Sequence, residues 1–302
     1  MDARPPASAY AAAVGMTVAF GLSFVATKYA LRGFEPLLLA LLRFALAGGI
    51  LWVVWRLRRG PERVSRAELG RLALLGFVSL TVYFSFENLG IARTSASEAA
   101  ILIATIPLLV VILNTFTLRE RTTARQWAGI AISFAGIAAL VLLGGGGAGG
   151  GSLTGNLLVL AASLSAGVYS ILARRMMVSR PALFVTTFQN LFGALFMLPL
   201  ALAEAALVGV RHPTPGAAGG VVFLTVVCSI TAFLLLNYAF RFIPASEVAV
   251  FINLTPIVAV AGAYVLLGER FTPGQAVAAV VVVAGVWLTN SGGGAARNPS
   301  AG

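Results

Sequence analysis

The sequence predicts an all-α integral membrane protein, in which ten transmembrane helices form two inverted five-helix repeats around a central cavity. Composition gives the first reason, because the 302 residues are 59% hydrophobic and only 10% charged, with a mean hydropathy of +0.94. A soluble domain carries about a quarter charged residues. An internal repeat gives the second reason, because residues 96–126 align without a gap on residues 245–275, with Pro107 on Pro256. Duplicated apolar segments indicate two copies of one helical unit in the membrane.

Ten segments are apolar over enough residues to cross a bilayer, whose hydrocarbon core of about 30 Å requires about 20 helical residues. Between the fifth and the sixth segment lies the Gly-rich stretch 144–152, which is typical of a flexible linker. In chain order the predicted spans are 10–31, 37–55, 71–91, 96–118, 125–143, 153–173, 182–203, 218–240, 246–267 and 273–290.

The distribution of arginine predicts how the chain is oriented. If the N-terminus lies inside, the inner segments hold 15 arginines and the outer segments hold four, as the positive-inside rule requires. The net charge of +11 is therefore interpreted as an orientation signal and not as a surface that binds nucleic acid. Because five is an odd number, the second half enters the membrane from the opposite face, and a pseudo-two-fold axis in the membrane plane relates the repeats.

We therefore expect a multi-pass protein of the bacterial inner (cytoplasmic) membrane with both termini in the cytoplasm. The first repeat is predicted at 1–143, a Gly-rich periplasmic linker at 144–152, the second, inverted repeat at 153–290 and a disordered cytoplasmic tail at 291–302. In such folds a substrate site lies near the membrane midplane between the repeats, and rocking of one half against the other exposes it to either side.

Several helix starts carry recognisable signals. Ser95-x-x-Glu98 predicts a capping box, in which the hydroxyl and the carboxylate satisfy free backbone N–H groups. The Thr-x-x-Gln sequences at 123–126 and 272–275 predict the same arrangement before the fifth and tenth spans. Glu98 and its counterpart Glu247 are accordingly interpreted as helix-start residues, with proton-coupling carboxylates as the alternative.

The repeats also place a proline inside the fourth and the ninth span, at Pro107 and Pro256. Each proline removes a backbone hydrogen bond and predicts a kink. The two kinks either shape a central cavity and act as bending points, or they serve packing alone. The Glu-Arg pairs at 120–121 and 269–270 are predicted to close tight hairpins.

Several motifs follow one another in a characteristic order along the chain. They are 20–24 (FGLSF) before Lys28, Arg43 in the second span, 95–121 ending in Glu-Arg, its repeat at 268–270, and the matched Asn88 and Asn237. With these residues the chain resembles the drug/metabolite transporter superfamily, specifically its ten-helix EamA-type exporters. The usual Trp-Gly of the first span is Phe20-Gly21 here, a small departure. Overall similarity is greatest to bacterial amino-acid exporters of the YddG type, which implies export of an amino acid.

Polar residues within the spans are the candidates for a substrate site. Tyr83 and Glu87 are four residues apart and share a helix face, and together with Asn88 and Asn237 they predict a polar lining. Glu87 is also the candidate for proton coupling, although facilitated diffusion needs no coupling. Further candidates, for each of which interhelical hydrogen bonding is the alternative, are Ser23, Thr27, Lys28, Tyr169, Gln189 and Asn253.

Charge within the spans narrows the class of substrate. A charge at the bilayer centre costs about 2.5–3.5 kcal/mol on insertion scales, and only Lys28 and Arg43 are available as cations there. Lys28 is interpreted as reaching toward the outer interface and Arg43 as held by a structural partner. Sugar phosphates would need several buried cations, so a zwitterionic or amphipathic metabolite fits this composition better.

Other function classes find little support. The only Asp is Asp2 and the only His is His212, so an aspartate pair or a zinc site is not expected, and no nucleotide-binding motif or other cofactor site is expected. Nothing resembles the selectivity-filter loop of a channel. We therefore expect a carrier that exports small amphipathic metabolites, foremost neutral or aromatic amino acids, by alternating access. A multidrug or other metabolite exporter of the same fold is the alternative; a channel or an intramembrane enzyme is disfavoured.

Overall fold

The computed structural model describes residues 6–59, 64–117, 122–144, 151–177, 181–242, 248 and 251–291. Within these ranges the side chains of residues 59, 144, 173–177, 182, 237, 240 and 241 are outside the description. Every regular element in this part of the chain is a helix.

The first half of the chain forms five helical passes, two of which are composed of several consecutive pieces. The third pass contains a central π-helical stretch, and the fourth is broken into two α-helices. The elements are α1 (Ala7–Ala30), α2 (Pro36–Arg59), α3 (Arg66–Gly76) with η1 (Phe77–Val82) and α4 (Tyr83–Ile91), α5 (Ala96–Ile103) with α6 (Ile106–Thr117), and α7 (Ala124–Gly144).

The second half repeats this pattern. Its third pass again has a π-helical centre, and the described part of its fourth pass begins anew at a proline. The elements are α8 (Leu153–Met177), α9 (Ala182–Val208), α10 (Pro215–Phe223) with η2 (Leu224–Ala232) and α11 (Phe233–Phe242), α13 (Thr255–Gly262) with η3 (Ala263–Leu267), and α14 (Pro273–Ser291).

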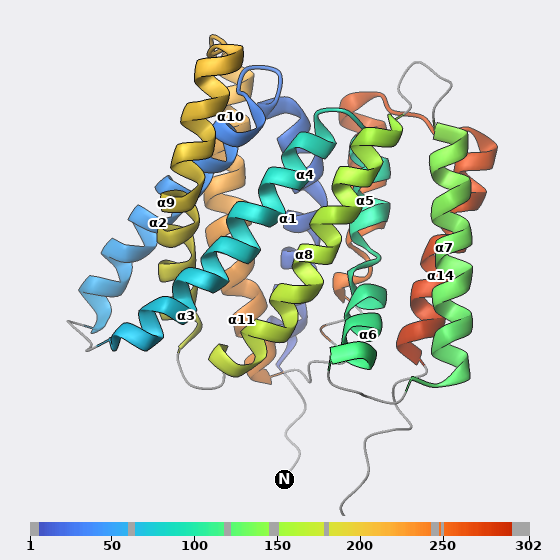
Figure 1. Cartoon of the computed structure of the whole chain (residues 1–302), viewed down its shortest axis with the longest axis horizontal. Coiled ribbons are helices and arrows are strands. Elements are labelled where there is room, and N and C mark those ends of the chain that lie inside the picture. Colours follow the sequence, from blue (N-terminus) through green and yellow to red (C-terminus); the bar gives the residue numbers. More distant parts are fainter. Residues whose placement is uncertain are drawn as a thin grey trace, which may run out of the picture.

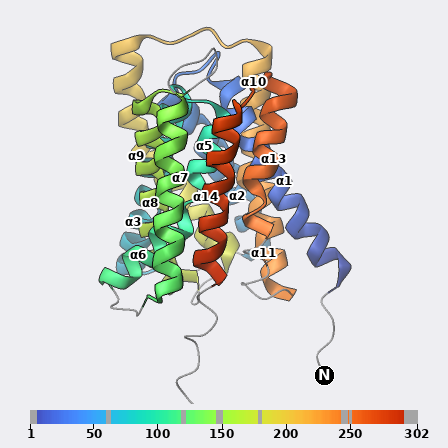
Figure 2. The ribbon, with the colours of Figure 1, turned by 90° about the vertical axis from the view of Figure 1, so that its right-hand side faces the viewer.

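The two halves run through the bundle in opposite directions. In Figure 1 α1 begins at the lower end and α7 finishes at the upper end, whereas α8 begins at the upper end and α14 finishes at the lower end. We call these the upper and lower ends throughout. Figure 2 shows the same directions from the side, with α7 and α14 adjacent in front. The predicted fold class is confirmed.

Nine helices in the described part of the chain are long and apolar enough to cross a membrane, and a shorter apolar helix, Thr255–Leu267, is the tenth. This helix belongs to the predicted ninth span, whose predicted start at residue 246 lies outside the described residues, as does most of the predicted linker. The chain is therefore a multi-pass membrane protein. The predicted domain boundaries and the predicted tail stay predictions.

The helix starts follow from local sequence. Thr123 N–H donates to Gln126 Oε1 at 2.9 Å while Gln126 N–H donates to Thr123 Oγ1 at 3.3 Å, which completes a capping box at the start of α7. The same reciprocal pair forms at 272–275 before α14. At α5 the prediction is half wrong. Ser95 Oγ accepts from Glu98 N–H at 3.0 Å, but the Glu98 carboxylate does not return to the Ser95 backbone and bonds other elements instead.

Small residues allow α7 and α14 to pack closely. A Cβ placed on Gly285 would lie 2.6 Å from the carbonyl oxygen of Gly129 and 2.6 Å from the backbone nitrogen of Ser133. A Cβ on Gly136 would lie 2.8 Å from Val282 N. Since membrane helices gain little from hydrophobic exclusion, such close van der Waals contact is what holds them together. The fifth and tenth passes therefore form a tight pair beside the central helices.

Candidate functional site

A central cavity of about 350 Å³ lies between the two halves. It extends from Glu87, near the upper end of α4, to Thr186, near the lower end of α9. Both repeats contribute to its wall, as an inverted-repeat carrier requires. Of the sequence-predicted site residues, the cavity is lined by Ser23, Tyr83, Glu87, Pro107, Tyr169, Gln189, Asn253 and Pro256.

The two predicted kinks are breaks in the helices, and both lie in the cavity wall. α5 ends at Ile103, and α6 starts at Ile106 immediately before Pro107. In the second half α13 starts at Thr255, immediately before Pro256. Broken helices at membrane depth are tolerated where protein or a polar cavity satisfies the freed backbone groups. A gating role for these prolines stays a prediction.

Arg43 is the cation of the cavity, and sequence reasoning had assigned it to a structural partner. Its side chain is 6% exposed, and Nε donates to Ser229 Oγ at 2.7 Å. The guanidinium carbon lies 4.7 Å from the ring centroid of Phe84 and 5.4 Å from that of Phe44. These cation–π contacts fix the group in the wall of the cavity without neutralising it. The signal that could have found it was the cost of an arginine well inside a span.

Glu87 is the anion of the cavity. It is 6% exposed, and Oε1 accepts a hydrogen bond of 2.8 Å from the hydroxyl of Tyr83. This is the helix-face pairing that the four-residue spacing predicted. Glu87 and Arg43 are close enough to interact electrostatically, but no ion pair within 4.0 Å joins these two described residues.

The remaining polar wall is neutral and comes mainly from the second half. Gln189 Nε2 donates to Ser79 Oγ at 3.4 Å, and Asn190 Nδ2 donates to the Thr186 carbonyl at 2.8 Å. Within the described part of the chain, Asn190 Oδ1 and Thr255 Oγ1 have no hydrogen-bond partner. Buried polar groups are normally satisfied, and these two atoms are exceptions on residues that line the cavity.

Three of the predicted binding residues lie outside the cavity wall. Asn88 is buried, and its Nδ2 donates to the Pro36 carbonyl at 2.9 Å, which ties α4 to the start of α2. Thr27 is buried in α1. Lys28 donates to the carbonyl oxygens of Ile91, at 2.6 Å, and Thr94. Asn88 and Lys28 therefore join helix ends in this structure, and a role of Thr27, Lys28 or Asn88 in substrate binding stays a prediction. The side chain of Asn237 lies outside the described residues.

Two carboxylates join the halves near the upper end of the bundle. The fully buried Glu98 accepts from Asn156 Nδ2 at 3.0 Å and from Gln275 Nε2 at 3.1 Å. Glu269 accepts from Ala96 N–H at 2.8 Å and from the N–H and hydroxyl of Ser97 at 3.0 and 2.7 Å. The Glu-Arg pair at 269–270 therefore does more than close a hairpin, because its carboxylate caps α5 of the other repeat. The pair at 120–121 lies outside the described residues.

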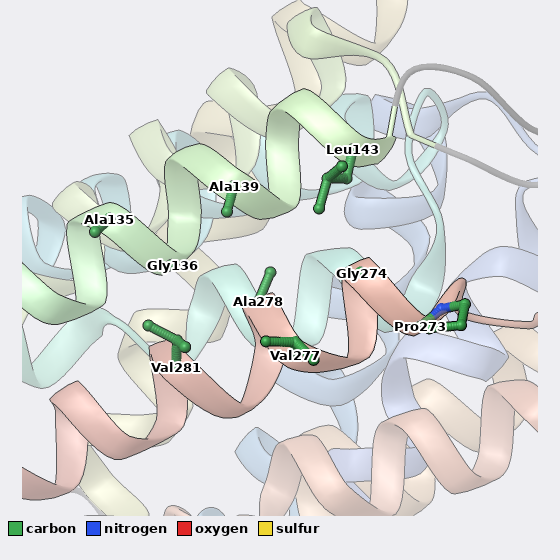
Figure 3. A pocket seen from close by; sticks show the side chains of 9 residues that line it. All are labelled: Ala135, Gly136, Ala139, Leu143, Pro273, Gly274, Val277, Ala278 and Val281. Carbon is green, nitrogen blue, oxygen red and sulfur yellow. The ribbon is translucent and has the colours of Figure 1, made fainter.

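A second depression, between α7 and α14, has no polar chemistry. Figure 3 shows Ala139 and Leu143 of α7 pointing toward α14 and Ala278 pointing toward α7. The lining side chains are apolar throughout, so this groove belongs to the lipid-facing side of the helix pair. In the described part of the chain, no group of three or more His, Cys, Asp or Glu side chains could hold a metal ion.

Comparison with known proteins agrees with this architecture. The chain is 28% identical over 275 residues to an uncharacterized transporter of Archaeoglobus fulgidus, with 89% of this chain and 92% of the relative covered. It is 29% identical over 276 residues to a probable terminal-alkyne amino-acid exporter of Streptantibioticus cattleyicolor, covering 90% of each. A solved crystal structure with 21% sequence identity has the same fold, with a TM-score of 0.63 over 92% of this chain and 98% of that one. The family description of EamA-like transporters matches the chain twice, over residues 7–142 and 153–291. The chain is therefore a transporter of the EamA-like family.

Proposed function

We propose that this transporter is an inner-membrane carrier that exports small amphipathic metabolites, with neutral and aromatic amino acids as its substrates. The observation that carries the proposal is the composition of the cavity wall. One cation and one anion, Arg43 and Glu87, lie among aromatic rings and neutral hydrogen-bonding groups. This combination suits a molecule with two opposite charges and an apolar side chain.

Aromatic rings give the cavity its apolar character. Rings of this kind bury a large apolar area and prefer tilted or edge-on contacts, so they accept both aliphatic and aromatic side chains. They are contributed by Phe20, Phe24, Phe44, Tyr83, Phe84, Tyr169 and Phe233. The Streptantibioticus relative, described as a probable terminal-alkyne amino-acid exporter, is in keeping with this substrate class.

Transport proceeds by alternating access between the inverted repeats. With both termini in the cytoplasm, the upper end of Figure 1 faces outward, and the contacts of Glu98 and Glu269 seal the cavity on that side. Export then requires these contacts to break while the lower end closes. The two repeats can exchange the open and closed arrangements of the two ends, because each half has the same breaks at mid-membrane.

Glu87 is the candidate for proton coupling, because it is a carboxylate within the cavity. Facilitated diffusion is the other energetic mode. Glu87→Gln separates the two: uphill transport driven by a pH gradient should be lost if Glu87 is the coupling group, while exchange down a concentration gradient continues. Uphill, pH-driven transport that persists in the variant would remove Glu87 from this role.

Counterflow in liposomes tests the function. Purified protein is reconstituted with amino acids, sugars, nucleosides or hydrophobic cations inside, and uptake of the matching labelled compound is followed. Saturable exchange of neutral amino acids is the expected result. Conductance would indicate a channel, and chemical turnover would indicate an enzyme. Exchange of another compound of the panel, with no exchange of any amino acid, would refute the substrate class.

A multidrug or other metabolite exporter is the second candidate. The aromatic rings together with the carboxylate of Glu87 favour hydrophobic cations, which bind to ring faces. The same panel of compounds distinguishes the two candidate functions, because a multidrug exporter should exchange hydrophobic cations and should not require a carboxylate on its substrate.

A further inference from the structure

We propose that Arg43 and Glu87 form a two-point anchor for a zwitterion, in which Arg43 binds the substrate carboxylate and Glu87 binds the substrate ammonium group. This inference rests on the proposed function and sharpens it. It names the charged groups that a transported molecule must carry, and it gives Arg43 a binding role in place of a structural one.

The first step is the unneutralised charge of Arg43. Its guanidinium forms one hydrogen bond, from Nε to the neutral Ser229 hydroxyl, and no carboxylate of the described residues lies within ion-pair distance. The two terminal nitrogens form no hydrogen bond with the described residues. They keep some exposed surface, and because Arg43 lines the cavity, the cavity reaches them. A charge removed from water is costly unless it is paired. An anionic ligand would pair it.

The second step is the geometry of the free nitrogens. Nε is bound to Ser229, and the rings of Phe44 and Phe84 hold the guanidinium plane. The terminal nitrogens are therefore left to face a ligand. A carboxylate accepts two parallel N–H bonds from such a group, which gives orientation as well as affinity.

The third step is the free half of Glu87. Oε1 accepts a hydrogen bond from Tyr83, whereas Oε2 has no hydrogen-bond partner among the described residues and keeps some exposed surface. Tyr83 fixes the carboxylate, and Oε2 can accept a hydrogen bond from an ammonium group. Because Glu87 and Arg43 do not pair directly, a ligand can enter between them.

The last step is charge balance. Among the described residues that line the cavity, Arg43 and Glu87 are the only two with a charged side chain, so the wall is neutral in sum. A zwitterion leaves neither charge unpaired. A monocarboxylic acid would leave Glu87 without a cation, and an amine would leave Arg43 without an anion. Each missing pair should cost about 10- to 100-fold in apparent affinity, the range for hydrogen bonds to charged groups.

Four related compounds separate these possibilities. Phenylalanine carries both charges, phenylalaninamide and phenethylamine lack the carboxylate, and 3-phenylpropionate lacks the ammonium group. Each is used to compete against counterflow of labelled phenylalanine, because competition does not depend on whether the competitor crosses the lipid unaided. With the wild-type protein, phenylalanine should compete about 10- to 100-fold better than any of the other three.

Two variants should each remove the requirement for one charged group of the substrate, and a third variant separates the charge of Arg43 from its geometry. Arg43→Gln should lower the apparent affinity for phenylalanine about 10- to 100-fold while leaving phenethylamine unchanged, so the preference for a carboxylate disappears. Glu87→Gln is the matched control, because it should remove the preference for an ammonium group and keep the preference for a carboxylate. Arg43→Lys, which keeps the charge and loses the bidentate geometry, should retain part of the carboxylate preference.

Because the test compares the affinities of one variant for several compounds, its result does not depend on how much protein is obtained. If Arg43→Gln gives too little counterflow, equilibrium binding of the same four compounds to the purified variant replaces it. The two-point anchor would be overturned if the wild-type protein exchanges phenylalanine and the Arg43→Gln variant still prefers phenylalanine over phenylalaninamide. The proposed function would then remain intact. A wild-type protein that neither binds nor exchanges any amino acid would overturn the proposed function itself.

Discussion

Glu269→Gln is the perturbation that tests how the upper end of the cavity stays closed. The carboxylate of Glu269 accepts hydrogen bonds from the first two amides of α5, at Ala96 and Ser97, and from the Ser97 hydroxyl. This contact joins the start of α5 to the segment before α14, and in the proposed alternating access it separates when the upper end opens. We expect the variant to open more often at this end.

The size of the effect follows from these contacts. Three hydrogen bonds to a charged acceptor are worth about 1.5–3 kcal/mol each, and the glutamine amide keeps one acceptor oxygen for neutral bonds worth about 1 kcal/mol. Glu269 is half-buried, so solvent screening reduces the difference. A net weakening of about 2–3 kcal/mol remains, which corresponds to about 30- to 150-fold more of the open form.

Access to the cavity from the upper end reports this population. Ala100 lies in the cavity wall one turn beyond Ser97 and is buried. In a Cys228→Ala background, Ala100→Cys is exposed to an impermeant thiol reagent on the outer face of spheroplasts. The modification rate should rise about 30- to 150-fold when Glu269→Gln is added, in proportion to the open population.

A chemically matched control exists at the same end. Glu204 of α9 accepts from the first amides of α2, Leu37 N–H at 2.8 Å and Leu38 N–H at 3.1 Å. Because α2 and α9 pack together along much of their length, this contact has no need to separate, and Glu204→Gln should leave Ala100→Cys protected. An unchanged modification rate in Glu269→Gln, or an equal rise in both variants, would refute the reasoning.

Three further predictions concern stability and binding. Lys28→Met removes both carbonyl contacts of the ammonium group and should lower the free energy of unfolding in detergent by about 2 kcal/mol, seen as a lower thermal midpoint; an unchanged midpoint would contradict the contacts. Gly285→Ala should cost about 1–3 kcal/mol through overpacking against Ser133, while Gly49→Ala, with nothing within 4 Å, should be neutral or slightly stabilising. Asn88→Ala should cost about 1 kcal/mol of stability and leave the KM for counterflow unchanged; a raised KM at normal protein levels would return Asn88 to the binding site.

Much of the fold was predictable because it depends on local and periodic features. Apolar segments of about 20 residues mark the spans, and the caps at 123–126 and 272–275 form between residues three apart, so no tertiary information is needed. Pro107 and Pro256 mark the breaks because proline cannot donate the helical hydrogen bond. Duplication over an odd number of spans gave the inverted topology.

The site was only partly predictable, because the sequence does not say which face of each helix turns inward. Glu87 and Asn88 are neighbours, and successive helical residues point about 100° apart, so the sequence alone does not say which of the two faces the cavity. Packing of α4 turns Glu87 toward the cavity and Asn88 toward Pro36. The same uncertainty concealed Arg43, whose location beside Ser229 depends on the second half of the chain.

By itself the sequence determined the membrane environment, the number of spans, the opposite directions of the two halves and the positions of the helix breaks, because hydropathy, duplication over an odd number of spans and proline geometry act within a segment or along the chain. Only the tertiary structure decided the partners of the buried carboxylates. Glu98 meets Asn156 and Gln275, and Glu269 meets the start of α5, more than 50 and 170 residues away in the chain. A carboxylate in a membrane bundle takes whichever donors the packed helices bring to it, and those donors exist only once both repeats are assembled.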